Sequence, residues 1–590
     1  MEELKNMKKK YLYTALLFVI LLGVYQYDIN QIYTMVEYPD EFGYWSTAAS
    51  MIGWDWSQMA SRGSYYSFGY SLILFPILKF CEDSVTAYKM AVTVNFLLIG
   101  VSFFLLRGIY KRIFTEQVEG EEILAIGSTL LYPAWILYSE MTMVDSLLMF
   151  MVILICYLWI RFVEKPGLRW GIALVIAVMY NYSLHMRAVS VVAALVITML
   201  LWAWRNPAYG KKILLVLLVA VVAFVAVDWI KDLVQGNVFA EAGTEKLNVN
   251  DYGGQLEKIK LLLSLEGIEQ AFVILMGKIL YIGIASAGMV FMAVLWSVKQ
   301  LGGLWKRKAA VSKESDSVDN NLKTQKEHLG IWLGVLFLFI LLGQLAVCIV
   351  YTVKTNNADW LIYARYIENF IPMGIFLGMA YVLQKRPGIK VQAVIAILYT
   401  IAAAACVWKM WGVTSDYIRG EHSVATSFLI GEGTVNPVHF FIQVWLMGML
   451  LMVLVRLGVR AYTKGKYKMA IFAVWFLGLA VWGIDAGKIY VYRANDNMSK
   501  EFIIVNTLEE QLQKGKDIYY LEEGNAQWVN NIQMQLRENT LDVISIEELK
   551  ELDPTVSAIV VDGQSDYLEY MEDNYKRKIT GYNYYAFYNK

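Results

Sequence analysis

The chain has 590 residues, of which 57% are hydrophobic and 18% charged, and its basic and acidic residues balance at 52 each. Soluble domains carry about 45–50% apolar and about 25% charged residues, so a chain this long and this apolar must place much of its surface in lipid. The zero net charge gives no support to a nucleic-acid partner. Few histidines and four scattered cysteines indicate neither a histidine-rich metal centre nor a disulfide framework.

Apolar runs predict about thirteen transmembrane helices, because roughly 17–25 apolar residues are needed to cross a bilayer. The predicted spans are 11–27, 86–106, 122–139, 144–162, 170–185, 188–204, 212–232, 270–298, 329–354, 366–384, 390–411, 437–459 and 467–491. A further apolar segment, 69–80, contains Pro76 and is too short to span, so we expect an interfacial or re-entrant piece. The predicted fold class is therefore an all-α polytopic membrane protein.

Basic residues set the expected orientation. They cluster in alternate loops, for example at Lys5–Lys10, Arg107–Arg112 and Arg456–Lys468, while the other loops carry acidic residues. By the positive-inside rule this pattern places the N-terminus inside and the C-terminus outside, as an odd number of spans requires. We therefore expect acidic loop residues such as Asp40 and Glu140 to face outside. Short basic loops and a compact outer tail are typical of a bacterial plasma-membrane protein.

The composition changes near residue 495, which divides the chain into a transmembrane domain, 1–494, and a domain 495–590 outside the membrane. The second domain is predicted to be a small α/β unit, because short buried strands alternate with helical patterns. The predicted strands are Asp517–Glu522, Leu541–Ile546 and Ala558–Asp562, and the helical stretches are 526–538 and 546–552. Because it has no recognisable catalytic motif, this domain is expected to have a binding or supporting role and not a catalytic one.

The outer loop 28–85 carries the most informative pattern. Its apolar positions 42, 45, 48/49 and 52 recur at helical spacing and predict a short amphipathic helix on the membrane surface, with Trp45, Trp54 and Trp56 at the interface. Asp40 lies where that helix begins. Its ordinary explanation is a helix N-cap, and a capping carboxylate is also held rigidly enough to serve as a base or a cation ligand.

The sequence Tyr38-Pro39-Asp40-Glu41, followed by Tyr44 and Ala48, comes directly after the first predicted span. This arrangement resembles the GT-C superfamily of membrane glycosyltransferases, in particular its protein-mannosyltransferase-like and aminoarabinose-transferase-like branch. The resemblance implies a many-helix enzyme that uses Asp40 and Glu41 in catalysis at the outer face. It also implies a second acidic site, here Glu140 and Asp145, and an Arg-Tyr element at the start of a late helix, here Arg365-Tyr366.

Three basic residues lie within or between apolar spans: His185, Arg187 and Lys278. A basic side chain at the bilayer centre costs about 2.5–3.5 kcal/mol on insertion scales, so each calls for an explanation. One ordinary explanation is that these side chains snorkel to the interface. For Glu140 and Asp145 the ordinary explanation is that they are solvated charges in a loop. Given the resemblance, the basic residues, together with Arg365 and Tyr366, are expected to bind the phosphate of a lipid-linked donor.

The expected function is thus the transfer of a sugar from a polyprenyl-phosphate donor to a glycan, lipid or protein acceptor at the extracytoplasmic face, with inversion at the anomeric carbon. Two alternatives remain open: a lipid-linked glycan flippase or other transporter, and a glycan polymerase or ligase that uses the loop 412–436. No dedicated metal cage is visible. A divalent cation, Mg²⁺ or Mn²⁺, stays open as a cofactor, with Asp40 and Glu140 as its ligands.

Overall fold

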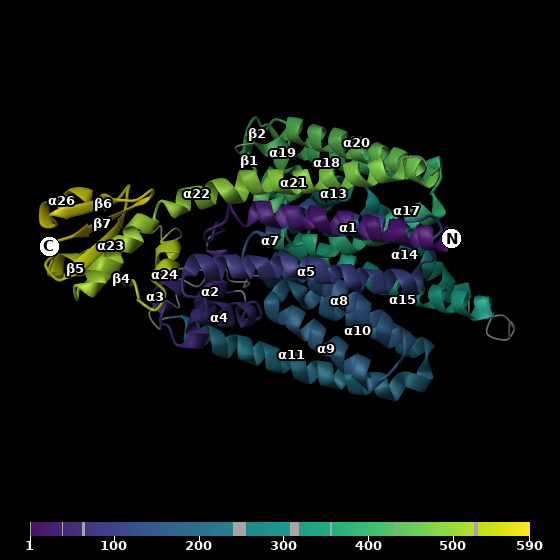
Figure 1. Cartoon of the computed structure of the whole chain (residues 1–590), viewed down its shortest axis with the longest axis horizontal. Helices are drawn as coiled ribbons and strands as arrows, with labels where there is room; N and C mark the ends of the chain where they lie inside the picture. The colour runs from purple at the N-terminus through teal and green to yellow at the C-terminus, as the bar shows by residue number, and fades with distance from the viewer. Residues whose placement is uncertain are drawn as a thin grey trace.

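The computed structural model describes residues 2–37, 39–61, 65, 67–239, 255–306, 318–354, 357–431, 433–465, 467–523 and 529–589. Tyr38 of the acidic motif lies outside these residues. The described chain forms an elongated helical bundle with the N-terminus at one end, and a small sheet domain that contains the C-terminus at the other (Figure 1).

Within the described residues, ten helical segments are long and apolar enough to cross a membrane. The helices that form them are α1 (Glu2–Asp28), α5 (Ser84–Ile113), α8 (Val144–Glu164), α10 (Val189–Arg205), α11 (Gly210–Val238), α13 (Leu265–Ala285), α15 (Val318–Thr352), α18 (Ile389–Lys409), α20 (Pro437–Thr463) and α21 (Lys468–Gly487). Every predicted span is helical, so the all-α polytopic class is confirmed. The inward N-terminus and outward C-terminus stay predictions.

The remaining three predicted spans are shorter or broken helices. The run 122–139 divides into α6 (Glu121–Leu130) and α7 (Pro133–Ser139), because Pro133 cannot continue the hydrogen bonding of a preceding turn. The other two are α9 (Leu168–Leu184) and α17 (Ile371–Lys385), which follows the short η5 (Glu368–Phe370). The three lie against the longer helices.

The predicted single span 270–298 is also broken. Ala287 and Gly288 adopt positive φ angles of 46° and 77° between the end of α13 and the start of α14 (Met289–Lys306). Gly288 suits this left-handed backbone because it has no Cβ. A continuous apolar composition concealed the break, so the expectation of one unbroken helix there was wrong.

The first outer loop folds into α2 (Asp40–Ile52), α3 (Ser57–Ala60) and α4 (Ser71–Phe80). The predicted helix is present, but every residue from Asp40 to Ala49 is buried. The Trp45 indole is fully covered and donates to the Thr142 hydroxyl at 2.9 Å. The position on the membrane surface was therefore wrong. The N-cap interpretation of Asp40 was wrong as well, because the cap is Pro39 and no side chain caps the helix.

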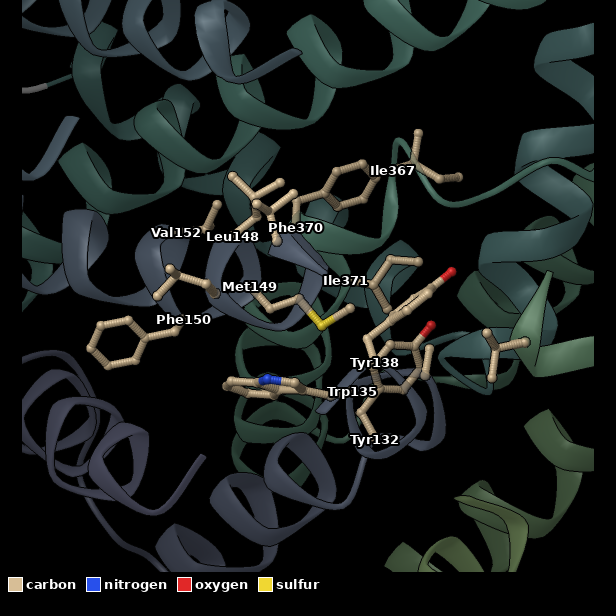
Figure 2. Close-up of a cluster of buried hydrophobic side chains, with 14 of the residues drawn as sticks. Tyr132, Trp135, Tyr138, Leu148, Met149, Phe150, Val152, Ile367, Phe370 and Ile371 are labelled. Carbon is tan, nitrogen blue, oxygen red and sulfur yellow. The ribbon is translucent and has the colours of Figure 1, made fainter. Parts of the chain in front are cut away.

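A buried cluster fixes the helix ends beneath this loop. Side chains of α7, α8, η5 and α17 interlock in it, among them Trp135, Met149 and Phe370 (Figure 2). Polar contacts tie the same elements, since Tyr132 donates to Glu368 at 2.5 Å and Trp135 to Ser146 at 3.1 Å. A close-packed interior of this kind holds the outer ends of α7 and α8 in fixed positions relative to the segment that follows α16 (Ala358–Ile362).

The C-terminal domain contains a five-stranded sheet in the order β4-β3-β5-β7-β6. Strands β3 (Asp517–Leu521), β4 (Asp542–Ile544) and β5 (Ser557–Asp562) are parallel and match the three predicted strands, whereas β6 (Arg577–Thr580) and β7 (Tyr584–Tyr588) pair antiparallel and were not predicted. The domain's helices are α22 (Arg493–Ser499), α23 (Phe502–Gln513), α24 (Asn530–Leu536), α25 (Ile546–Glu551) and α26 (Leu568–Asn574). Helix α22 continues from α21 through a π-helical turn, Lys488–Tyr492.

This domain packs directly on the first outer loop. The side-chain oxygen Oδ1 of Asn495 accepts the backbone N–H groups of Tyr33 and Thr34 at 2.6 and 2.8 Å. Trp56 donates to the Arg537 carbonyl at 2.6 Å, and the Arg537 guanidinium donates to two carbonyls at the end of α4. The sheet domain therefore supports the loop that carries α2.

Candidate active site

Four charged residues from distant parts of the chain form one buried network, here called the Asp40 network. Arg365 donates from Nη1 to Asp40 Oδ2 at 2.6 Å and from Nε to Asp145 Oδ2 at 3.2 Å. Arg187 donates from Nη2 to Asp145 Oδ1. Asp40 begins α2, Asp145 lies in the first turn of α8, and Arg187 lies in η1 (Met186–Ala188). Arg365 follows α16, so four segments meet here.

The charges in this network balance. Asp145 and Arg187 are 1% and 3% exposed, and Asp40 and Arg365 are 7% and 8% exposed. An isolated buried charge is strongly unfavourable, and two carboxylates matched by two guanidiniums avoid that cost. Removing one member of a buried pair destabilises a protein by about 3–5 kcal/mol, so the network also fixes the four segments relative to one another.

Arg187 has donors that the protein does not use. Its guanidinium lies 4.9 Å from the ring centroid of Tyr366, and Nη2 is bound to Asp145. Nε and Nη1 are buried and have no hydrogen-bond partner within the described chain. Buried donors without partners are rare in native structures. The guanidinium fork suits a phosphate, which it can bind through two parallel hydrogen bonds.

His185 and Tyr366 pack around Arg187 and are not part of the ion-pair network. His185 Nδ1 accepts the backbone N–H of Arg187 at 3.1 Å, and the His185 ring packs edge-on against Tyr366 at 5.9 Å. The two rings therefore fix the position of the Arg187 backbone and side chain. Of the predicted phosphate-binding residues, Arg187, Arg365, His185 and Tyr366 are brought together.

Lys278 has a different location among these residues. Its ammonium group is buried in α13 and donates to the carbonyl oxygens of Trp360 and Leu361 at 2.7 and 3.2 Å. It also lies 5.7 Å from the ring centroid of Tyr363. Because α16 ends there, Lys278 anchors the backbone that leads to Arg365. Among the described residues, no hydrogen bond or ion pair joins Lys278 to the Asp40 network.

Glu41 is saturated by hydrogen bonds. Its Oε1 accepts the backbone N–H groups of Val36 and Glu37 at 2.8 and 2.9 Å. Its Oε2 accepts the Tyr88 hydroxyl at 2.6 Å, and both the hydroxyl and the N–H of Thr142 at 2.6 and 2.7 Å. A carboxylate with five donors is fixed rather than poised to react, so Glu41 holds the turn before α2 against the start of α8.

Glu140, expected beside Asp145, belongs to a separate group. The Tyr492 hydroxyl donates to Asp28 and lies 3.3 Å from Glu140 Oε1. Burial raises the pKa of Glu140 well above its ordinary value, and the neighbouring charge of Asp28 adds to the rise. Within the described residues no ion pair or hydrogen bond joins Glu140 to Asp40 or Asp145. The structure thus separates the predicted acidic pair, and it does not bring Asp40 and Glu140 together as metal ligands.

Three further residues lie close to this site and were not predicted as site residues: Glu37, Asp359 and His422. Glu37 precedes α2, Asp359 lies in α16, and His422 ends η6 (Gly420–His422) in the loop 412–436. Asp359 accepts from Arg419 and contacts His422 Nδ1 at 3.2 Å. Their only sequence signal is a position in loops on the same predicted side, which many other polar residues share.

Comparison with known proteins identifies the fold. No family model matches the chain, and no curated protein matches it by sequence. Among solved structures it resembles ArnT from Cupriavidus metallidurans bound to undecaprenyl phosphate, with 14% identity, a TM-score of 0.50 and 98% of each chain covered. The apo state of the same ArnT matches at 13% identity, a TM-score of 0.51 and the same coverage. The chain therefore has an ArnT-like fold over almost its whole length.

Proposed function

We propose that this protein is an integral-membrane glycosyltransferase that takes its sugar from a polyprenyl-phosphate donor. The observation that carries the proposal is the pair of buried Arg187 donors, Nε and Nη1, which lack a protein partner beside the Asp40 carboxylate network. An anionic oxygen ligand would satisfy both donors. The ArnT-like fold supports the same class, since that enzyme was captured with undecaprenyl phosphate.

The proposed reaction is a direct displacement at the anomeric carbon. An acceptor hydroxyl oxygen attacks that carbon while its proton passes to the Asp40 carboxylate, which acts as general base. The bond between the anomeric carbon and the phosphate oxygen breaks, and its electron pair leaves with the lipid phosphate. Hydrogen bonds from Arg187 stabilise the charge on that phosphate as it develops. One displacement of this kind inverts the anomeric configuration.

The other members of the network have positioning roles in this proposal. Arg365 binds Asp40 and Asp145 together, and so sets the base at a fixed place relative to Arg187. Glu41 fixes the turn before Asp40, while Lys278 anchors the chain before Arg365. The Arg187 guanidinium lies over the Tyr366 ring, and His185 binds the Arg187 backbone N–H and packs against that ring. Correct orientation of this kind supplies a large part of enzymatic rate enhancement.

We further propose that the site faces outside a bacterial plasma membrane and that the acceptor is a glycan, a lipid or a protein. Helix α2 lies at the end of the bundle nearest the sheet domain and farthest from the N-terminus, which agrees with the orientation expected from the basic loops (Figure 1).

The test uses purified full-length protein in lipid nanodiscs with radiolabelled undecaprenyl phosphate as the probe. We expect saturable binding that weakens by about 10–100-fold in Arg187→Ala, because hydrogen bonds to charged groups contribute about 1.5–3 kcal/mol. Mass spectrometry of lipid co-purified with the wild type should identify a polyprenyl phosphate or its glycosyl derivative. Binding without any sugar transfer in bacterial membranes would favour the flippase alternative, and wild-type affinity in Arg187→Ala would contradict the proposal.

A further inference from the structure

A second cluster lies beside the Asp40 network and contains metal-ligating atoms. One carboxylate oxygen of Glu37, one of Glu421 and one ring nitrogen of His422 all lie within 4.8 Å of one another. The first comes from the turn before α2, and the other two come from η6. The two outer segments are separated by most of the chain and converge only in the folded structure.

The histidine in this cluster is already oriented. Its Nδ1 contacts Asp359 Oδ2 at 3.2 Å, and Asp359 in turn accepts the backbone N–H and the guanidinium of Arg419 at 3.0 and 3.3 Å. Burial opposes ionisation of Asp359, but the contacts with His422 and Arg419 hold its pKa below the ordinary value. With Nδ1 committed to Asp359, Nε2 is the ring nitrogen left for a ligand. A carboxylate behind a histidine is the usual outer partner of a metal-bound imidazole.

The backbone under Glu421 and His422 is fixed as well. The Tyr138 hydroxyl donates to the Glu421 carbonyl at 2.7 Å, and the Ala364 N–H donates to the His422 carbonyl at 2.7 Å. The Tyr363 ring packs edge-on against His422 at 4.7 Å, and His422 is only 5% exposed. The same chain segment therefore supports this cluster through residue 364 and the Asp40 network through the next residue.

The carboxylates of the cluster lie close together. Glu37 lies near the carboxylates of Glu421 and Asp40. Within the described residues no ion pair joins Glu37 or Glu421 to a basic side chain. Two carboxylates placed this close repel each other unless a proton or a metal ion lies between them.

We propose that Glu37, Glu421 and His422 bind a divalent transition-metal ion, Zn²⁺ or Mn²⁺. An imidazole with two carboxylates suits these ions, whereas Mg²⁺ and Ca²⁺ favour all-oxygen ligand sets. Three protein ligands leave a coordination position open for water or for a ligand oxygen. The ion would join the first outer loop to the loop 412–436 next to the Asp40 network. The proposal concerns metal binding and does not depend on the reaction proposed above.

The experiment uses full-length protein purified without a polyhistidine tag, stripped with a chelator and titrated with Zn²⁺ or Mn²⁺. Elemental analysis after desalting should give one ion per chain for the wild type, with Mg²⁺ bound far more weakly. Glu421→Gln and His422→Ala should lose the stoichiometric ion. Asp359→Asn should weaken metal affinity by about 10–100-fold, as loss of an outer partner does in known sites. His439→Ala, an exposed histidine at the start of α20, is the matched control and should bind like the wild type.

Two results would overturn the proposal: no stoichiometric ion in the wild type, or full retention of the ion in both Glu421→Gln and His422→Ala, which would mean adventitious metal only. Size-exclusion profiles and Tm identify variants that fail to fold. If Glu421→Gln or His422→Ala fails to fold, the metal affinity of Asp359→Asn decides, because this variant keeps all three ligands. Binding of undecaprenyl phosphate to the metal-free protein tests the proposed function independently of the metal site, because Arg187 and the metal ligands are different residues.

Discussion

Two groups of buried carboxylates differ in whether a guanidinium lies beside them. Asp40 and Asp145 are bound to the guanidiniums of Arg365 and Arg187, whereas Glu140 contacts another acid, Asp28, through Tyr492. The two guanidiniums balance the charges of the first group. In the second, burial favours the neutral form of Glu140. Glu140 and Asp145 are five positions apart in sequence, yet their surroundings favour different protonation states. Only the first group suits a base in catalysis.

The largest expected effect comes from removing the base of the first group. Asp40→Asn keeps the size of the side chain but cannot accept a proton from the acceptor. We expect sugar transfer to fall by about 10²–10⁴-fold, the usual contribution of general base catalysis. The measurement is the initial rate of transfer in nanodiscs with the donor identified from co-purified lipid. Undecaprenyl phosphate should still bind, and an unchanged rate would break the distinction between the two groups.

A smaller effect is expected from Arg365→Lys. Lysine keeps the charge but cannot reach two carboxylates with a rigid fork, so Asp40 and Asp145 would no longer be bound together. Loss of one such charged hydrogen bond corresponds to about 1.5–3 kcal/mol, or roughly 10–100-fold in transfer rate. The rate loss should appear in kcat more than in KM, because Arg365 positions the base. A variant with wild-type kcat would show that the Asp40–Arg365 contact is only structural.

Glu41→Gln should act on stability first. Glu41 now accepts hydrogen bonds from four residues: Val36, Glu37, Tyr88 and Thr142. In the variant an N–H₂ group, which is itself a donor, would face some of these donors. One or more buried donors would lose their acceptor at a cost of about 1–3 kcal/mol each. A lowered Tm in detergent, with transfer activity falling in parallel at higher temperature, is the expected result. If Tm is unchanged while activity is abolished, Glu41 takes part in the chemistry itself.

The smallest effect is expected from Glu140→Gln, because glutamine resembles the protonated acid. Transfer should continue at the wild-type rate. The folded-state pKa of Glu140 is raised, so the stability linked to its bound proton is complete below the ordinary carboxyl pKa and is lost as pH rises through the raised value. Tm of the wild type should therefore fall at higher pH more steeply than Tm of Glu140→Gln. A large loss of transfer in this variant would show that Glu140 takes part in the reaction.

The helices could be predicted from sequence because apolar length alone determines whether a segment crosses a bilayer. The break at Ala287 and Gly288 could not, since the apolar composition continues through it. Strand β6 was missed because it is short and mostly polar, and β7 because aromatic residues occupy both of its faces and hide the alternation. The buried position of α2 depends on the sheet domain and on Thr142, which no local pattern reveals.

The members of the Asp40 network could be named from sequence, but their pairing could not. Arg365 binds residues 325 and 220 positions away, and Arg187 binds one 42 positions away. Glu140 lies near Asp145 in the chain, yet the turn after α7 directs the two side chains to different partners. Pairing across such distances follows from helix packing, which a single sequence does not encode in any short pattern.

The most direct test of the Asp40 network as the active site is a cryo-electron microscopy structure in nanodiscs with undecaprenyl phosphate bound. We predict that the lipid phosphate lies within hydrogen-bond distance of Arg187 Nε and Nη1, with Asp40 on the side where an acceptor would approach the anomeric carbon. A phosphate bound elsewhere, with both Arg187 donors still without a partner, would contradict the account.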